Sequence, residues 1–227
     1  MVDPKKAKFF KYAGAIWKTW HDMASHTNVI SGLAVKAFKL NTVAMNELLT
    51  CQNCKSHFKS MRNDPKYNID SWLRTSKDLF NLTMNMHNEA NQQIGKPVYD
   101  LDAGWKLYEN SHKTCYYIDD MWKSWHYFSA NTKVEDSTQL KAYMIYTLTM
   151  RELMVCPEYK NIFDSIMRSP QNNIQKWSRS QKDLFTLSWN VHNEVNKRLN
   201  KPAIEPLEKM WEEYHEDEGC DACSVVG

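Results

Sequence analysis

The chain consists of two copies of one sequence pattern, and this duplication constrains its fold more than any other feature. A shift of 105 positions aligns residues 17–97 with residues 122–202 without a gap. Between Cys51 and Pro97, 21 of the 47 positions are identical to their counterparts between Cys156 and Pro202. A repeat of this length forms one structural unit, so we expect two similar bundles packed against each other.

The periodicity of apolar residues within each copy is helical. In the first copy, apolar residues from Trp72 to Ile94 recur at steps of three, four or seven, which marks one face of a long helix. We expect Asn68 or Asp70 to cap the start of this helix, and the glycine and proline that follow Ile94 to end it.

Further helices are expected on either side of this long helix, at residues 13–26, 33–49, 51–62 and 105–108. Asp64 and Pro65 stop the helix expected at residues 51–62. No alternating strand pattern competes with the helical one. The expected fold is therefore all-α, with two tandem four-helix bundles that each carry a short fifth helix.

The composition excludes several classes of protein. Lysine and arginine contribute 29 residues and aspartate and glutamate 27, so the chain lacks the strong positive charge with which proteins bind nucleic acids. No run of about 18 apolar residues is present, and the N-terminal sequence lacks the apolar core of a secretory signal. We therefore expect no nucleic-acid partner, no membrane span and no signal peptide.

Two cysteine pairs have the spacing CxxC, namely Cys51 with Cys54 and Cys220 with Cys223. A CxxC pair at the start of a helix is close enough to form a disulfide, and the helix dipole favours the reactive thiolate. Redox chemistry is one interpretation. The alternatives are a zinc site built by these four cysteines, or two incidental buried thiols at Cys51 and Cys54. A thioredoxin is disfavoured because its alternation of strands and helices is missing from the pattern.

Polar residues gather at the end of the long helix that follows the first CxxC. His87 and Asn91 lie four positions apart and share a helix face, with Asn88 and Lys96 close by. Ring, amide and ammonium groups in one place suit a nucleotide with a pyrophosphate, whereas an ordinary polar helix end is the plainer interpretation. On the first helix, Trp17 and His21 are also four apart, a spacing that by itself is more often core packing.

Taken together, these motifs resemble the Erv/ALR family of FAD-linked sulfhydryl oxidases. That family has a tryptophan and a histidine four apart on its first helix, a CxxC at the start of the third, and HNxVNxxLxKP at the end of the fourth. Here these positions are Trp17 and His21, Cys51 and Cys54, and HNEANQQIGKP at residues 87–97. Trp105 stands in the place of a later family tryptophan, and the resemblance covers both halves.

The resemblance implies a helical bundle that holds FAD beside the CxxC. Cys54 is then the sulfur next to the flavin and Cys51 the one exposed to incoming thiols. A dithiol reduces this disulfide, Cys54 passes two electrons to the flavin, and oxygen reoxidises the flavin to give hydrogen peroxide. The implied FAD contacts are Trp17, His21, Cys54, His87, Asn88, Asn91, Lys96 and Trp105.

The chain departs from the family pattern at three places. Asn85 replaces a family histidine, and Gly14 replaces a basic residue, so a phosphate contact must come from elsewhere. The family's structural disulfide joins the positions of Met84 and Leu101, where this chain has no cysteine. Loss of both partners is consistent with an apolar contact in place of the bridge.

The second copy lacks the cysteine next to the flavin. The duplication places Cys156 on Cys51 but Tyr159 on Cys54, so this copy cannot pass electrons by the same route. It keeps counterparts of the other motif residues, for which we favour a packing role over a second flavin. By analogy with family dimers, the second half resembles an internal partner. The retained residues are Trp122, His126, His192, Asn193, Asn196 and Lys201.

The C-terminal sequence carries the second CxxC, Cys220 and Cys223, after an acidic helix end. Many family members use such a dithiol as a shuttle between the substrate and the active-site pair, and incidental cysteines are the alternative. Cys115 and Cys156 have no spacing signature. They are expected either to be buried thiols or to pair with each other.

The sequence therefore predicts an FAD-dependent sulfhydryl oxidase that uses oxygen to form disulfides in protein thiols. The expected parts are a catalytic domain at residues 1–110, a degenerate domain at 111–215 and a tail at 216–227. A zinc-stapled scaffold and a flavin-bound assembly factor are the rival hypotheses, and a homodimer is an open alternative. The resemblance is consistent with the host cytoplasm or virion of a large DNA virus, or with the mitochondrial intermembrane space.

Overall fold

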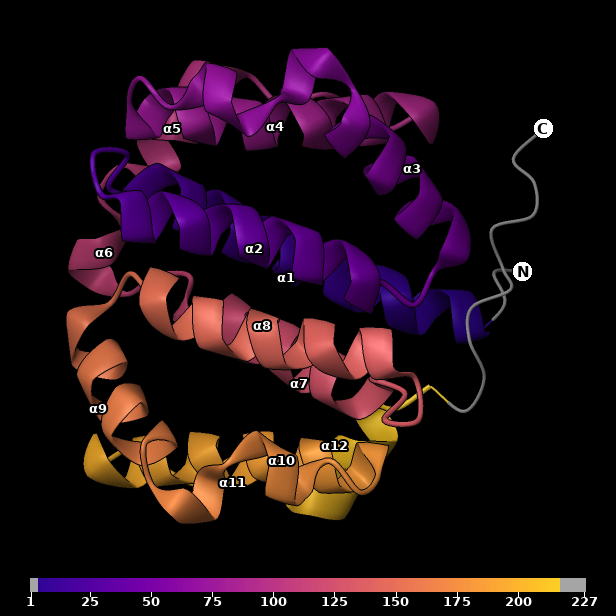
Figure 1. The fold of residues 1–227 in the computed structure, drawn as a ribbon, viewed down its shortest axis with the longest axis vertical. Coiled ribbons are helices and arrows are strands. Elements are labelled where there is room, and N and C mark those ends of the chain that lie inside the picture. The colour runs from indigo at the N-terminus through magenta and orange to yellow at the C-terminus, as the bar shows by residue number, and fades with distance from the viewer. Residues whose placement is uncertain (1–3, 217–227) are drawn as a thin grey trace.

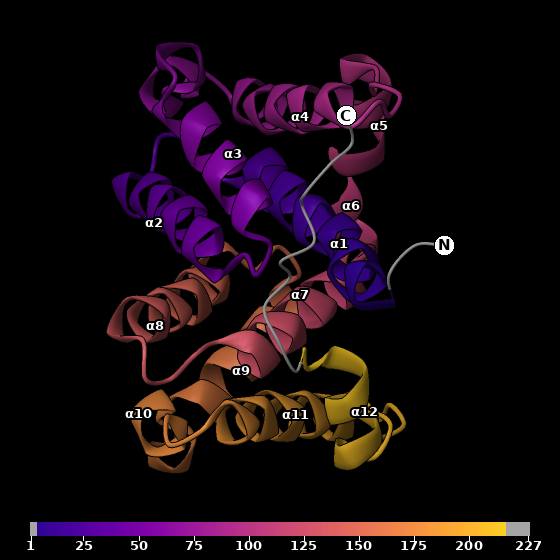
Figure 2. The ribbon, with the colours of Figure 1, turned by 90° about the vertical axis from the view of Figure 1, so that its right-hand side faces the viewer.

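The computed structural model describes residues 4–216 and is built from helices stacked in layers (Figure 1). An outer layer of the first half covers its first two helices, which pack on the first two helices of the second half, and a second outer layer follows (Figure 2). The helices of the first half are α1 Pro4–His26, α2 Gly32–Leu48, α3 Gln52–Asn63, α4 Ser76–Gln93 and α5 Leu101–Tyr108.

A short helix, α6 Ser111–Thr114, connects the two halves. The second half repeats the pattern of the first with α7 Ile118–Asn131, α8 Ser137–Leu153, α9 Pro157–Met167, α10 Ile174–Trp177, α11 Gln181–Arg198 and α12 Leu207–Tyr214. Over residues 4–216 no strand is formed, and no helix there is both long and apolar enough to cross a bilayer. The all-α prediction is confirmed.

The two halves are related as the subunits of a symmetric dimer would be. Thr19 on α1 and Ser124 on α7 are equivalent positions of the duplication, and their buried hydroxyl oxygens lie 3.2 Å apart. When equivalent residues contact each other, a twofold axis passes between them. The helices α2 and α8 also pack against each other along their length. The expected internal pseudo-dimer is thus present.

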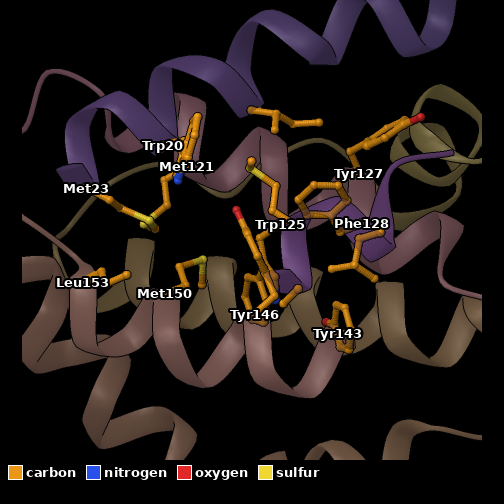
Figure 3. Close-up of a cluster of buried hydrophobic side chains, with 14 of the residues drawn as sticks. Trp20, Met23, Met121, Trp125, Tyr127, Phe128, Tyr143, Tyr146, Met150 and Leu153 are labelled. Atoms are coloured by element: carbon orange, nitrogen blue, oxygen red, sulfur yellow. The ribbon is translucent and has the colours of Figure 1, made fainter. Parts of the chain in front are cut away.

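Buried hydrophobic side chains of both halves form one continuous cluster (Figure 3). The indole of Trp20 donates a hydrogen bond of 3.0 Å to Thr42, and that of Trp125 donates an equivalent bond of 3.0 Å to Thr147. Paired in this way, a buried indole N–H loses no hydrogen bond on leaving water. The same indole–threonine pair therefore recurs inside each half.

The start of the long helix differs from the prediction. The helix α4 begins at Ser76, and Thr75 caps it by accepting the backbone N–H of Asp78 at 3.0 Å. The Thr75 hydroxyl also contacts the Asp78 carboxylate, which completes a local capping motif. Asn68 caps a separate 3₁₀ helix, Ile69–Trp72, so neither Asn68 nor Asp70 starts α4. Two short 3₁₀ turns, Pro65–Tyr67 and Pro170–Asn172, occupy the loops after α3 and α9.

An apolar cluster occupies the region where the resemblance places a disulfide. Phe80 and Met84 of α4 pack with Tyr108 and Tyr117, and Leu101 lies against them. The apolar contact expected in place of the Met84–Leu101 bridge is therefore found. Elsewhere Cys115 and Cys156 form a disulfide, which decides between the two expectations for them.

Candidate functional site

Cys51 and Cys54 form a disulfide at the start of α3, with Cα atoms 5.2 Å apart. Cys51 is the N-cap of the helix, and its sulfur accepts the backbone N–H of Cys54 at 3.2 Å. The free N–H groups of a helix start favour negative charge, so a thiolate formed here on reduction is stabilised. The prediction of a redox geometry at this helix start agrees with the arrangement.

The two sulfurs differ in their surroundings, and one prediction about them is wrong. Cys51 was expected to be the exposed sulfur, but its side chain is 0% exposed and packs in the main apolar core. As the N-cap, it turns back over the first turn of α3 rather than outward. Cys54 is only half-buried and lies on the wall of a large cavity.

This cavity has a volume of about 1020 Å³ and lies within the first half. It is bounded by the helices α1 to α5 and the segment after α5. Six of the eight predicted flavin contacts line it: Trp17, His21, Cys54, His87, Asn91 and Lys96. These residues come from three helices and the turn after α4, and only the tertiary fold brings them together.

A stack of rings forms one side of the cavity. The indole of Trp17 and the imidazole of His87 are parallel within 1° at a centroid distance of 4.4 Å. His21 fixes the stack from behind, because its Nε2 lies 3.0 Å from Nδ1 of His87 and its Nδ1 lies 2.8 Å from the hydroxyl of Thr83. This wall presents a flat, rigid surface to the cavity.

Both histidines of the wall are held neutral. Burial, with a smaller contribution from the nearby Lys96 ammonium, lowers the pKa of His87 to about 4. Burial also lowers the pKa of His21 well below its usual range, with a smaller contribution from His87. A neutral imidazole has one donor and one acceptor nitrogen, so both hydrogen bonds of the Thr83–His21–His87 chain can form without a charged ring.

The remaining two predicted contacts, Asn88 and Trp105, are not among the residues that line the cavity. The Asn88 amide donates to the carbonyl of Tyr99 at 2.8 Å and accepts the N–H of Tyr99 at 2.7 Å. Trp105 packs edge-on against Phe80 at 5.5 Å. In this structure Asn88 shapes the cavity by holding the chain after α4, and Trp105 supports α5.

The turn after α4 explains why the HNxxN pattern recurs in both copies. The Asn91 side-chain amide donates to the backbone carbonyl of Pro97 at 3.2 Å, and the backbone carbonyl of Asn91 accepts the N–H of Lys96 at 2.8 Å. Asn196 makes the corresponding bonds with Pro202 and Lys201. The two asparagines thus fold the chain back over the helix end, which sets the position of Lys96 and Lys201.

Several cavity residues were missed at the level of sequence. His57 was expected to be an exposed helix residue, but it lines the cavity and its buried Nε2 has no hydrogen-bond partner among the described residues. Lys18 and Lys106 also line the cavity and supply positive charge, as the loss of a basic residue at Gly14 required. The linker between the halves contributes Tyr116 and Tyr117. Neither spacing nor periodicity marks these positions.

The cavity fits a flavin dinucleotide by size and by chemistry. Ligand pockets have volumes of about 300–1,000 Å³ and are mostly apolar with a few placed polar groups. Here aromatic rings supply flat apolar surface, and three lysines offer charge for a pyrophosphate. The buried Nε2 of His57 has no hydrogen-bond partner among the described residues and could contact a polar group of a ligand. No atom lies within 4 Å of the position that a Cβ would take on Gly14, which leaves room for a ligand.

The second half keeps the ring stack but fills the corresponding space. Trp122 and His192 are parallel within 4° at 4.0 Å, yet Trp122 is 2% exposed whereas Trp17 is half-buried. Tyr159, in the place of Cys54, is buried with its hydroxyl on the Lys201 ammonium. Packing is therefore the role that the geometry favours for these retained residues.

Cys220 and Cys223 lie outside the described residues, so the predicted shuttle stays a prediction. The zinc alternative would need the thiolates of Cys51 and Cys54 as ligands. These two sulfurs are bonded to each other here. In this disulfide-bonded form the pair has no free thiolate for a metal.

Comparison with known families agrees with this geometry. A family model described as the Erv1 / Alr family matches residues 14–111 and, separately, residues 119–215. Comparisons with curated proteins and with solved structures gave no match. The family is known for sulfhydryl oxidase activity, and its members typically bind FAD. Since the two matches together span most of the sequence, the chain belongs to the Erv1 / Alr family as a tandem of two family domains.

Proposed function

We propose that this protein is an FAD-dependent sulfhydryl oxidase with one active centre, in its first half. The observation that carries the proposal is the position of Cys54. It belongs to a disulfide at a helix start and also lines a cavity large enough for a flavin dinucleotide. A dithiol pair beside a flavin-sized cavity is the arrangement that electron transfer from thiols to a flavin requires.

Two groups of side chains would hold the cofactor. The Trp17–His87 stack offers a flat surface to a planar ring, while Lys18, Lys96 and Lys106 offer ammonium groups to the phosphates. Asn91 keeps Lys96 in place through the turn it closes. When bound, FAD would accept two electrons from the reduced CxxC and pass them to oxygen, giving hydrogen peroxide.

The chain's own residues carry out the thiol chemistry. A substrate thiolate attacks the Cys51–Cys54 disulfide, and a second substrate thiol resolves the mixed disulfide. The substrate leaves with a new disulfide, and the chain keeps two reduced sulfurs. The N–H groups at the start of α3 stabilise the thiolate of this reduced pair. Protein thiols are therefore the proposed substrates and oxygen the electron acceptor.

The C-terminal end of the described chain supports a shuttle role for Cys220 and Cys223. The Tyr127 hydroxyl donates to the Glu216 carboxylate at 2.9 Å and lies 2.6 Å from the hydroxyl of Thr50. Thr50 directly precedes Cys51, and Glu216 lies four residues before Cys220.

Four residues of extended chain reach at most roughly 14 Å. Glu216 is itself fixed to the second half, because its backbone N–H donates to the Asn131 side chain at 2.8 Å. This anchoring near Thr50 favours delivery of electrons from the tail dithiol to the Cys51–Cys54 pair within one chain, without a second copy.

The experiment that tests the proposal begins with the colour of the purified protein. We expect a yellow protein that releases flavin on denaturation and consumes oxygen when supplied with a dithiol. A colourless protein with bound zinc would favour the scaffold hypothesis instead. A yellow protein that consumes no oxygen would favour the flavin-bound assembly factor.

A further inference from the structure

The segment that connects the two halves forms part of the cavity wall in the first half. Asn110, Ser111, Thr114, Tyr116 and Tyr117 all line the cavity. This segment follows the last helix of the first family domain and precedes the first helix of the second. The linker therefore builds a binding site as well as joining two domains.

Two adjacent tyrosines of the linker face the cavity in different ways. Tyr117 is buried and stacks on Tyr108 of α5, with ring centroids 4.2 Å apart and planes within 9°. Tyr116 is 71% exposed and touches Tyr117 edge-on at 4.9 Å. Tyr117 thus anchors the linker to α5, while one large ring, Tyr116, stands at the cavity with little protein against it.

The backbone just before Tyr116 is held in an unusual conformation. Cys115 has φ of 51°, in the left-handed region that side-chain-bearing residues other than asparagine rarely occupy. The turn is closed by the N–H of Tyr116 on the carbonyl of Ser111 at 3.3 Å. Such a conformation persists only where the surroundings hold it.

The second half and α1 provide that restraint. Cys115 is bonded to Cys156, the N-cap of α9, across 41 positions of sequence. On the other side the Ser111 hydroxyl donates to the Asp22 carboxylate, and His112 Nδ1 lies 2.9 Å from His26 Nε2. The linker is thus fixed at both ends, once to each half of the molecule.

We propose that Tyr116 is a cofactor-binding residue and that the Cys115–Cys156 disulfide is the device that positions it. The inference rests on the proposed function, because the ligand is the aromatic ring system of the flavin dinucleotide. The degenerate half then takes part in cofactor binding without holding a cofactor, since it keeps the cysteine equivalent to Cys51 and uses it to hold the linker. Cys115 and Cys156 stay oxidised during turnover and transfer no electrons.

The test measures the dissociation constant of FAD for the protein freed of flavin, by quenching of flavin fluorescence. Tyr116→Ala removes a ring that can stack on the cofactor and should weaken FAD binding about tenfold. Tyr116→Phe keeps the ring and should bind like the natural protein. Leu148→Ala, which removes an exposed side chain of α8 far from the cavity wall, serves as the control and should change nothing.

The positioning role of the disulfide is tested by a double-mutant cycle. Cys115→Ser with Cys156→Ser should also weaken FAD binding, and adding Tyr116→Ala should give little further loss because both changes remove the same contact. If the fold-loss of FAD affinity in the combined variant equals the product of the losses caused by Tyr116→Ala and by the two serine substitutions, the positioning role is refuted. If the natural protein binds FAD and Tyr116→Ala binds it equally well, this inference is wrong and the proposed function stands. If the natural protein binds no FAD, both are wrong.

Discussion

The ammonium group of Lys201 donates a hydrogen bond to the hydroxyl of Tyr159, at the two positions that correspond to Lys96 and Cys54 in the first half. The same ammonium lies 5.0 Å from the centroid of the Tyr159 ring. One substitution therefore removes the sulfur that would reduce a flavin and turns the matching lysine toward the protein. The two halves share a framework, but the cysteine on the cavity wall of the first half is replaced by a buried tyrosine in the second.

This difference predicts one FAD per chain. In the second half, the buried ring of Tyr159 takes the place of the Cys54 side chain. Met210 is the fourth residue of α12, and the fourth residue of α5 is Gly104, which lines the cavity of the first half. Both changes put side-chain atoms where a ligand would lie. The ratio of flavin absorbance to protein concentration in the purified protein should give a stoichiometry of one. A stoichiometry of two would show that the second half also binds flavin.

The duplication supplies a matched control for the ring stack. His87→Ala removes the ring stacked on Trp17 and should weaken FAD binding by about tenfold or more. His192→Ala removes the equivalent ring stacked on Trp122 and should leave FAD affinity unchanged. Both variants should be destabilised, because each leaves a buried histidine without its partner. Equal losses of FAD affinity in the two variants would contradict the assignment of a single site.

Stability should fall as the pH is lowered from 6.5 towards 4. Burial lowers the pKa of His87 and of His192 to about 4, and lowers those of His21 and His126 well below the usual value. Below pH 6.5 the unfolded chain binds protons that the folded chain does not. The free energy of unfolding then falls by about 1.4 kcal/mol per pH unit for each such histidine.

Two carboxyl groups act against this trend. Burial raises the pKa of Asp22 to about 6 and also raises the pKa of Asp120, so both groups favour the folded state as the pH falls towards 4. Four histidines outweigh these two groups, and the net slope keeps its sign. Urea unfolding at pH 7, 6 and 5 measures the effect. An unchanged free energy of unfolding across this range would contradict the neutral, buried imidazoles.

The hydroxyl of Tyr127 should matter for large substrates. Tyr127→Phe removes the bonds to Thr50 and Glu216 and should cost about 1 kcal/mol of stability for each bond. It should slow oxidation of a reduced protein substrate while leaving oxidation of a small dithiol nearly unchanged. Cys220→Ser with Cys223→Ser should give the same difference more strongly. Equal rates for both substrate sizes would remove the shuttle from the account.

Helical periodicity and the duplication were sufficient to predict the all-α fold and the paired halves. The start of α4 was misplaced because Asn68 and Asp70 are good caps in a loop that forms its own 3₁₀ turn. A better signal was present at Thr75, which has an acidic residue three positions later, as capping motifs do. Cap chemistry was therefore more informative here than the first polar residue before the apolar stripe.

The cavity was predictable only in part. His87, Asn91 and Lys96 share one helix end, so local spacing was enough to group them. His57 and Tyr116 reach the cavity from separate elements, and only the packing of α3 and of the linker brings them there. The Cys115–Cys156 pairing depends on the same tertiary contacts, because it joins the linker to the start of α9.

The most direct test of the central claim is an anaerobic titration of the flavin-loaded protein with a small dithiol. The visible flavin absorbance should bleach in the natural protein, because electrons pass from the reduced Cys51–Cys54 pair to the flavin beside Cys54. Cys54→Ser should keep its flavin and its colour throughout the titration. A Cys54→Ser variant that bleaches at the rate of the natural protein would contradict the account.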